Sequence, residues 1–476
     1  MGKKIKPKNV YLIGIKGVGM TMLAQFLREK GNNLSGSDID ESFMTDRVLK
    51  KEKIKVFAPF SIANIPGKID LIIHSLAYTP ENNCELRYIK NNPEKFKNIP
   101  LITYAEALGQ VFNEYYGIAV CGSHGKTTTS AWLGYVLWKA GKKPNVLVGS
   151  RVPQFGGSTL MGQAKYFVAE VDEYKNKLQY CSPQGVVLNN IEFDHPDYFK
   201  DQAAYTQVFA DFLKKIPASG WLVINNRDPE IKKIKKYCAG QILTYDLDAD
   251  NKTVPTVNYL AQNLQMSDGY QTFNVNDWGE FKIKLWGEHN VYNALAVIAA
   301  ARALKVSIPD IKKHLAGFKG TERRAQLLGQ YKGALIIDDY AHHPTEIKAT
   351  LEGISARYPQ KNIITVFHPH TFTRTKALFK DFVASFGKTK ELIILDIYGS
   401  AREKRGGVSS AQLAKEISHY NKINHISQTV KHIATISEAT VYLKNKLKAN
   451  NLLLLMGAGD VFRIANSLLK YGKSRG

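Results

Sequence analysis

Residues 119–130 read Ala119-Val-Cys-Gly-Ser-His-Gly-Lys-Thr-Thr-Thr-Ser130. The apolar run that precedes the first glycine predicts a β-strand, and the apolar residues after Ser130 predict a helix. Glycines in such a turn let backbone N–H groups converge on an anion, and the helix N-terminus adds partial positive charge. Lys126 can reach the outer phosphates of a nucleotide, and Thr127 can offer its hydroxyl to Mg²⁺. The stretch therefore predicts a phosphate-binding loop for ATP.

The spacing inside this loop departs from the usual pattern, which has four residues between its first glycine and its Gly-Lys pair. Here only Ser123 and His124 lie between the two glycines. An ordinary strand–turn–helix corner is the alternative, but the Lys-Thr pair directly after the second glycine favours an ATP site. The loop residues expected to contact ATP are Gly122, Ser123, His124, Gly125, Lys126, Thr127 and Thr128.

Length and charge restrict the class of protein. At 476 residues the chain is too long for one core, and its length suggests about three domains. A composition of 44% hydrophobic and 22% charged residues is typical of a soluble globular protein. The net charge is +23, but the basic residues are scattered and form no arginine-rich arm or RNA-binding signature. We therefore expect small-molecule substrates and no nucleic-acid partner.

Cysteine content and hydropathy indicate the compartment. The four cysteines lie far apart, with no pair at metal-ligand spacing, which favours a reducing cytosol. No apolar run approaches the ~18 residues that a membrane span needs. The basic N-terminus is followed by an apolar stretch that glycines and a lysine interrupt, so no signal peptide is expected. The sequence thus predicts a cytoplasmic protein, either a monomer or a homodimer.

Alternating strand and helix patterns predict an α/β protein with three domains. Residues 1–115 are expected to form an N-terminal Rossmann-like domain. Residues 116–317 are expected to form a central P-loop ATPase-like domain, with a parallel sheet and a β-rich insertion. Residues 318–476 are expected to form a C-terminal Rossmann-like domain, since apolar runs again alternate with amphipathic helices.

A second glycine-rich turn follows the first predicted strand, Val10–Ile15, and precedes a predicted helix at Met20–Lys30. Its order, G-x-x-G-x-G, resembles but does not match the dinucleotide fingerprint. An NAD-dependent oxidoreductase is therefore one alternative, but the ATP loop about 100 residues later argues against it. We predict that the turn holds the diphosphate of a nucleotide-linked (UDP) substrate. The residues expected there are Gly14, Gly17, Val18, Gly19, Asp38 and Ser75.

Acidic and histidine residues follow two of the central apolar runs. Glu170 ends one predicted strand, and His195 follows another in Asn190-Ile-Glu-Phe-Asp-His195. If both strands neighbour the strand of the phosphate loop, these side chains face the loop, because ligands gather at the carboxyl ends of parallel strands. They could then share one or two Mg²⁺ ions with ATP. A solvated acidic loop with a capping Asp-His pair is the alternative.

Taken in order, the motifs resemble those of the Mur ligases, the ATP-dependent amide-forming enzymes of peptidoglycan precursor synthesis. The resemblance covers nearly the whole chain and its three-domain plan. The motifs that carry it are Gly122–Thr129, Glu170–Glu173, Asn190–His195, Gly287–Asn293, Gly320–Arg324 and Asp338–Glu346.

Within the family, the chain is similar to the member that adds L-alanine to UDP-N-acetylmuramate. Pro369–Thr375, Ser400–Lys404 and Gly457–Asp460 match that member's style, although Thr371 stands where it usually has a basic residue. A sister enzyme that attaches a recycled tripeptide to the same acceptor ranks second. That sister usually carries Pro-Arg-Ser-Asn-Thr where this chain has Pro-His-Thr-Phe-Thr. A nucleotide-regulated binding module without turnover is the non-enzymatic alternative.

The resemblance implies a role for each matching residue. For ATP, it implies Lys126 and Arg324 on the phosphates, Asn290 and Asn293 on the adenine side, and Asp339 on the ribose. For Mg²⁺, it implies Thr127, Glu170 and His195. For the substrate carboxylates, it implies His342 and Arg374. The catalytic set is then Lys126, Glu170, His195, Arg324 and His342.

The implied reaction proceeds through an activated acid. The muramyl carboxylate attacks the γ-phosphorus of ATP to give an acyl phosphate and ADP. The amine of alanine then attacks the acyl carbon, and phosphate leaves. Charge accumulates on the transferred phosphoryl group, so Mg²⁺, Lys126 and Arg324 act by electrostatic stabilisation and positioning. The amine must lose a proton, and His342 or His343 is the candidate acceptor.

Overall fold

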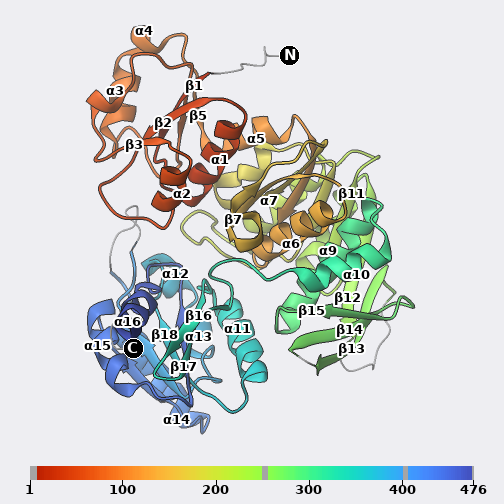
Figure 1. Ribbon diagram of the computed structural model, residues 1–476, viewed down its shortest axis with the longest axis vertical. Coiled ribbons are helices and arrows are strands. Elements are labelled where there is room, and N and C mark those ends of the chain that lie inside the picture. Colours follow the sequence, from red (N-terminus) through yellow and green to blue (C-terminus); the bar gives the residue numbers. More distant parts are fainter. Residues whose placement is uncertain (1–7, 249–255, 268, 400–405, 474–476) are drawn as a thin grey trace.

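The computed structural model describes residues 8–248, 256–267, 269–399 and 406–473. Within these ranges the chain forms three α/β units, each built around its own sheet (Figure 1). This confirms the predicted fold class, whereas the boundaries at 115/116 and 317/318 stay predictions. No helix in the described ranges combines the length and apolar character needed to cross a membrane.

The N-terminal unit contains a five-stranded parallel sheet in the order β3-β2-β1-β4-β5. The order reverses beside β1, which creates a crevice at the carboxyl end of that strand, where α/β proteins bind ligands. The turn Gly14–Gly19 lies there. The elements are β1 (Asn9–Ile13), α1 (Val18–Glu29), β2 (Asn33–Ser37), α2 (Asp46–Lys51), β3 (Lys55–Phe57), β4 (Leu71–His74), α3 (Cys84–Asn91), α4 (Pro93–Phe96), β5 (Leu101–Thr103) and α5 (Tyr104–Phe112).

The central unit contains a ten-stranded mixed sheet in the order β15-β14-β13-β12-β11-β10-β6-β9-β7-β8. Its middle strands are parallel. The sequence predicted a β-rich insertion, and in the structure β13, β14 and β15 pair antiparallel there. The strands are β6 (Tyr116–Cys121), β7 (Asn145–Val152), β8 (Gly157–Leu160), β9 (Tyr166–Glu170), β10 (Gly185–Leu188), β11 (Trp221–Asn225), β12 (Gln241–Asp248), β13 (Tyr259–Ser267), β14 (Tyr270–Val275) and β15 (Glu280–Ile283). The helices are α6 (Lys126–Lys139), α7 (Gln202–Leu213), α8 (Pro229–Ile234), α9 (Glu288–Ala303) and α10 (Ile308–Gly317).

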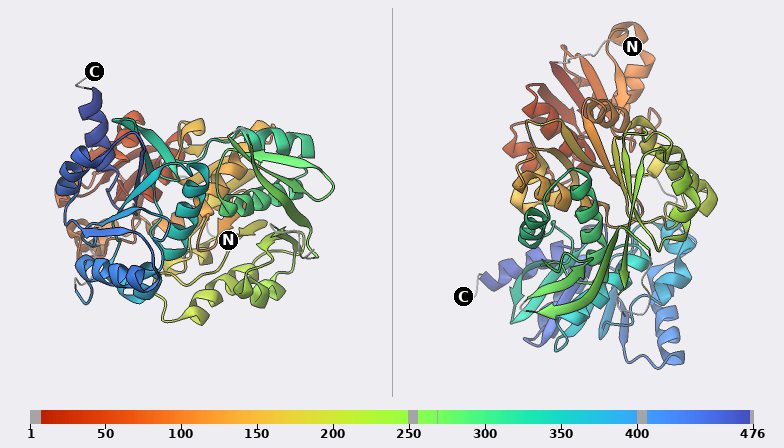
Figure 2. Two further views of the ribbon diagram at one scale, coloured as in Figure 1. Left: turned by 90° about the horizontal axis from the view of Figure 1, so that it is seen from below. Right: turned by 90° about the vertical axis from the view of Figure 1, so that its right-hand side faces the viewer.

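Helices cover both faces of this sheet (Figure 2). Helices α6, α9 and α10 pack with the strands into one core, and α7 packs into the core on the other face. Helix α6 is buried on nearly all sides, as expected for a helix without a strongly polar face. The indole of Trp132 donates to the Leu315 carbonyl at 3.2 Å and stacks on Phe318. Helix α6, which follows the phosphate loop, is thereby fixed to the segment that leads to the C-terminal unit.

The C-terminal unit contains a six-stranded sheet in the order β16-β17-β21-β18-β19-β20. Only the edge strand β16 is antiparallel, and β21, the last strand in the sequence, lies between β17 and β18. The motif Ser400–Lys404 lies outside the described residues. The strands are β16 (Gln326–Tyr331), β17 (Ala334–Asp339), β18 (Asn362–Phe367), β19 (Glu391–Ile394), β20 (Thr429–His432) and β21 (Asn451–Met456). The helices are α11 (Pro344–Arg357), α12 (Phe372–Ala377), α13 (Phe379–Val383), α14 (Ser410–Ile423), α15 (Ile436–Lys446) and α16 (Arg463–Lys473).

Candidate active site

The strand of the phosphate loop lies between the two strands that carry the acidic and histidine motifs. Val120 of β6 is in register with Glu170 of β9, and Cys121 is in register with Leu188 of β10. All three strands are parallel, so their carboxyl ends meet at one edge of the sheet. Both motif strands therefore neighbour the strand of the phosphate loop, as the prediction of a shared site requires.

The two glycines of the loop are required by the protein's own packing. Gly122 has φ +120°, and a Cβ there would lie 2.7 Å from the Asn190 carbonyl oxygen. Gly125 has φ +79°, and a Cβ there would lie 2.5 Å from Oδ1 of Asn293. Backbone N–H groups of the loop donate to Asn190: Ser123 to its carbonyl at 3.1 Å and His124 to its side chain at 2.8 Å. The loop is thus held by the strand ends beside it.

Lys126 is held by a carboxylate to which the sequence assigned no role. Its Nζ lies 3.3 Å from Oε2 of Glu173, 3.0 Å from the Ser123 carbonyl and close to the Gly122 carbonyl. Burial lowers the pKa of Lys126, but the neighbouring carboxylates, Glu173 above all, outweigh it and raise the pKa. Glu173 is 1% exposed and also accepts from the Tyr205 hydroxyl at 2.8 Å. A second carboxylate three residues after Glu170 was the signal that could have revealed it.

The structure brings two of the three predicted magnesium ligands into contact. The Thr127 hydroxyl donates to Oε1 of Glu170 at 2.8 Å, while Oε2 accepts from the Gly149 N–H at 2.6 Å. Nε2 of His195 lies 3.6 Å from Oε1 of Glu173. The Thr127 hydroxyl and the Glu170 carboxylate supply oxygen donors, which suit Mg²⁺, and the His195 ring lies beside the neighbouring Glu173. The residues therefore fit a magnesium ion at the start of α6.

A cavity of about 560 Å³ lies between the central and C-terminal units. Lys126 and Thr127 are not among its lining residues, although Gly125 and Thr128 on either side of them are. Trp286, which was not predicted from the sequence, also lines the cavity. The centroid of its ring lies 4.3 Å from the Arg357 guanidinium, and the ring offers an aromatic surface for a nucleotide base. The predicted ATP residues that line the cavity are His124, Gly125, Thr128, Asn290, Asn293, Arg324 and Asp339.

Polar residues of this cavity also brace the protein around it. The Asn290 amide donates to the Trp286 carbonyl at 2.7 Å, and the Asn293 amide donates to Oδ1 of Asn290 at 3.2 Å. Asp339 accepts from the backbone N–H of Ala325 at 2.6 Å. Burial raises the pKa of Asp339 to about 6, against the lowering effect of the Arg324 guanidinium.

His124 of the phosphate loop links the central unit to the C-terminal unit. Its Nε2 donates to Glu192 at 2.9 Å, and its Nδ1 lies 3.2 Å from Oε1 of Glu346 in α11. Burial lowers the pKa of His124, but the two carboxylates overcome this and raise it to about 9. Donor atoms of His124, Glu192 and His343 lie within 4.8 Å of one another, a spacing that a cation could use. Because carboxylates already engage both nitrogens of His124, we assign the cluster as an interdomain link.

Arg374 and His342 belong to the C-terminal unit and lie near the boundary with the central unit, which we call the seam. Arg374 forms a two-pronged ion pair with Asp194, with its Nε 2.9 Å from Oδ1 and its Nη2 3.2 Å from Oδ2. The structure thus gives Arg374 a carboxylate partner from the protein, and its predicted contact with the amino acid stays a prediction. Nδ1 of His342 donates to the Tyr340 carbonyl at 2.9 Å. Burial lowers the pKa of His342 to about 4, so its imidazole is neutral at physiological pH.

The N-terminal turn faces a second cavity, of about 290 Å³, between the N-terminal and central units. Gly17, Val18, Gly19 and Ser75 line it, opposite Glu170 of the central unit. A Cβ on Gly17 would meet only the Gly14 carbonyl oxygen, at 3.5 Å, whereas a Cβ on Gly19 would lie 2.8 Å from the Tyr104 ring. The absence of a side chain at Gly17 thus leaves space for a ligand, whereas at Gly19 it leaves space for the Tyr104 ring.

Two other residues predicted for this turn support it from behind and do not line the cavity. Asp38 is 2% exposed and accepts from the backbone N–H of Lys16 at 2.7 Å. Gly14 has φ +83°, and a Cβ there would lie 2.7 Å from the Tyr78 ring. Contact of Asp38 with the UDP-linked substrate stays a prediction, since the structure shows the carboxylate accepting a hydrogen bond from the turn.

Three family models match consecutive parts of the chain. They are described as Mur ligase family, catalytic domain (residues 9–116), Mur ligase middle domain (120–301), and Mur ligase, glutamate ligase domain (323–459). Two curated relatives are named UDP-N-acetylmuramate–L-alanine ligase. The one from Desulfitobacterium hafniense is 38% identical over 97% of this chain and 100% of its own length. The one from Clostridium kluyveri is 38% identical over 98% of each chain.

Solved structures share the fold. A UDP-N-acetylmuramate–alanine ligase from Thermotoga maritima superposes with a TM-score of 0.79 at 23% identity, covering 98% of this chain and 100% of that one. A murein peptide ligase from Psychrobacter arcticus superposes with a TM-score of 0.72 at 22% identity, covering 97% and 98%. Both likenesses extend over all three sheets.

Proposed function

The chain belongs to the Mur ligase family, and from that premise we propose that it joins L-alanine to UDP-N-acetylmuramate in a reaction driven by ATP. One observation carries the proposal. The start of α6 lies between two cavities, because His124 and Thr128 line the one beside the C-terminal unit and Glu170, bonded to Thr127, lines the one beside the N-terminal turn. A nucleotide in the first and a UDP-linked acid in the second meet at Lys126.

This arrangement suits formation of an acyl phosphate. The acid, oriented by the turn at Gly17, attacks the terminal phosphorus of ATP, and ADP leaves into the larger cavity. Lys126 and Arg324 face the phosphates and stabilise charge on the transferred phosphoryl group. Glu173 positions the Lys126 ammonium, so the donor is arranged before the reaction begins.

We assign Mg²⁺ to Thr127, Glu170 and His195. When bound there, the ion neutralises phosphate charge and holds the acid and the phosphate together. Glu170 is fixed in its position by the Gly149 N–H. The other carboxylate oxygen accepts from Thr127, and Glu170 lines the cavity beside the N-terminal turn.

His342 is the candidate acceptor for the proton that the amine loses. Because Nδ1 donates to the Tyr340 carbonyl, the lone pair of the neutral ring lies on Nε2. The low pKa of His342 leaves the ring unprotonated at neutral pH but also makes it a weak base. We place the reaction in the cytoplasm, which agrees with the four free cysteines of the described chain. The protein itself is proposed to be a monomer or a homodimer.

The test is an assay of ADP and phosphate release with UDP-N-acetylmuramate and a panel of L-alanine, glycine, L-serine and L-Ala-γ-D-Glu-diaminopimelate. We expect release that requires both the muramyl substrate and L-alanine. Much faster reaction with the tripeptide would replace the proposal by the recycling ligase. Tight binding of NADH without any ligation would favour the oxidoreductase instead.

A further inference from the structure

The segment that crosses from the central to the C-terminal unit changes its attachment at a single peptide bond. Up to Glu322 it is bound to the central unit, where its N–H donates to the Arg151 carbonyl at 2.9 Å and its carbonyl accepts from the Ser150 hydroxyl at 2.9 Å. From Arg323 onward it is bound to the C-terminal unit. Arg323 donates to Asp338 at 3.0 Å and to the Gly457 carbonyl at 2.7 Å.

The backbone at this changeover is unusual. Arg323 has φ +60° and Ala325 has φ +45°, left-handed values that non-glycine residues seldom adopt. Arg324, which lines the nucleotide cavity, stands between them. Any rotation of the C-terminal unit about the Glu322–Arg323 peptide therefore moves this arginine directly.

The side chain of Glu322 joins all three units at this point. Its Oε1 lies 2.8 Å from Nη1 of Arg151 on β7, and its Oε2 lies 2.6 Å from Nη2 of Arg47 on α2. The Glu322 side chain is 11% exposed, whereas those of Arg151 and Arg47 are 33% and 55% exposed. One carboxylate at the hinge thus holds an arginine from each of the other two units.

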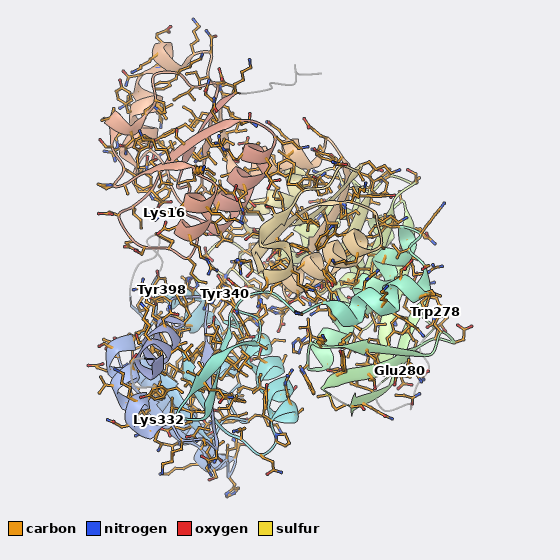
Figure 3. The ribbon with its side chains drawn as sticks, viewed as in Figure 1. Lys16, Trp278, Glu280, Lys332, Tyr340 and Tyr398 are labelled. Carbon is orange, nitrogen blue, oxygen red and sulfur yellow. The ribbon has the colours of Figure 1, made fainter. Side chains whose placement is uncertain are left out.

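Helix α2 is in turn attached to the turn that faces the second cavity. The Thr45 hydroxyl donates to the Lys16 carbonyl at 2.5 Å, and Nζ of Lys16 lies 3.8 Å from Oδ1 of Asp46. Figure 3 shows Lys16 at the margin of the N-terminal unit that faces the C-terminal unit, whose near edge carries Tyr340 and Tyr398. A continuous series of contacts therefore runs from the glycine-rich turn through α2 and Arg47 to Glu322 and the hinge.

We propose that Glu322 is a positioning residue that couples the two substrate sites: occupation of the turn by the UDP-linked substrate favours the hinge position that directs Arg324 toward the nucleotide. This inference rests on the proposed function. Coupling of this kind is reciprocal, so the nucleotide must also strengthen binding of the UDP-linked substrate. Because Arg47 is 55% exposed, the Arg47 contact should contribute a coupling of only about twofold to fivefold.

The experiment is a calorimetric titration of a non-hydrolysable ATP analogue with and without UDP-N-acetylmuramate. The proteins are the wild type, Arg47→Ala, Glu322→Gln, the double variant, and the control Arg87→Ala, whose side chain contacts only its own unit at Pro80 and Glu81. We expect the UDP-linked substrate to tighten analogue binding in the wild type and the control. Each single variant should lose most of that gain, and the double variant should lose no more.

The coupling factor separates positioning from a merely structural role, because a structural defect would weaken each ligand when titrated alone. Unchanged coupling in both single variants, or losses that add in the double variant, would overturn the inference while leaving the ligase proposal intact. Failure of the wild type to bind either substrate would instead overturn the proposed function.

Discussion

The protein contains two glycine-rich connections between a strand and a helix, and they use their glycines differently. In the phosphate loop, added Cβ atoms at Gly122 and Gly125 would collide with Asn190 and Asn293, so these glycines serve the packing of the loop itself. In the N-terminal turn, a Cβ at Gly17 meets only one backbone oxygen, at 3.5 Å. The glycines of the first loop are thus required by the fold, whereas at Gly17 the fold leaves room for a Cβ and we expect the ligand to impose the requirement. Substitutions in the two regions should therefore fail in different ways.

The largest effect is expected at the phosphate loop. Lys126→Ala removes the only charged side chain that we place on the terminal phosphate besides Arg324. Loss of one transition-state donor typically lowers kcat by about 10²- to 10³-fold, so we expect at least that loss in ADP release. The thermal unfolding midpoint must be measured beside it, because the buried carboxylate of Glu173 loses its cation. Near-normal turnover in a folded Lys126→Ala protein would refute the ATP site.

The seam between the central and C-terminal units should respond next. Arg374→Lys leaves a cation but cannot supply two parallel donors, whether to Asp194 or to the alanine carboxylate. Loss of one charge-assisted hydrogen bond costs about 1.5–3 kcal/mol, which corresponds to a rise in KM for L-alanine of about 10- to 100-fold. The KM for UDP-N-acetylmuramate serves as the internal control. An unchanged KM for L-alanine would remove Arg374 from the amino-acid site.

The N-terminal turn offers a matched pair of variants. Gly17→Val places a side chain in space that the fold leaves open, so we expect the KM for the UDP-linked substrate to rise about tenfold, as for moderate overpacking of 1–3 kcal/mol. The KM for ATP should hardly change. Gly19→Val collides with Tyr104 and should instead lower the unfolding midpoint. If Gly17→Val destabilised the protein as much as Gly19→Val, the contrast between ligand space and packing space would be wrong.

The smallest effect should come from pH. The folded-state pKa of His124 is about 9, above its ordinary 6.5, so its link to Glu192 and Glu346 stabilises the fold fully below about pH 6.5. That contribution declines as pH rises from there and is lost as it passes about 9. We expect the difference in unfolding midpoint between the wild type and His124→Gln to shrink between pH 7 and pH 10. If the unfolding midpoints of the two proteins changed in parallel with pH over that range, the charged His124 ring would contribute nothing to stability.

Much of the site could be predicted because its residues follow apolar runs that can only be strands. Glu170 and His195 come to the phosphate loop since β9 and β10 pair with β6. Contacts between distant residues could not be predicted in this way. Arg374 and Asp194 are 180 residues apart, and no local pattern indicates that they pair.

Local geometry explains the other differences from prediction. The first strand ends at Ile13, two residues before the predicted Ile15, because Gly14 turns the backbone into a positive φ. Gly19 lines the second cavity, and its contact with the ligand stays a prediction, but the sequence did not indicate Tyr104, which lies against it from 85 residues away. The sequence pattern shows where a glycine is needed without showing what approaches it.

The position of β21 has a consequence for the synthesis of the protein. Strand β21 leaves the ribosome after β17 and β18, yet it lies between them in the middle of its sheet. The first two sheets can form while translation continues, but the third must wait for residues 451–456. The carbonyl of Gly457, which anchors Arg323, comes directly after that strand. A nascent chain that has not reached residue 457 therefore lacks both the centre of its third sheet and the carbonyl that anchors the hinge.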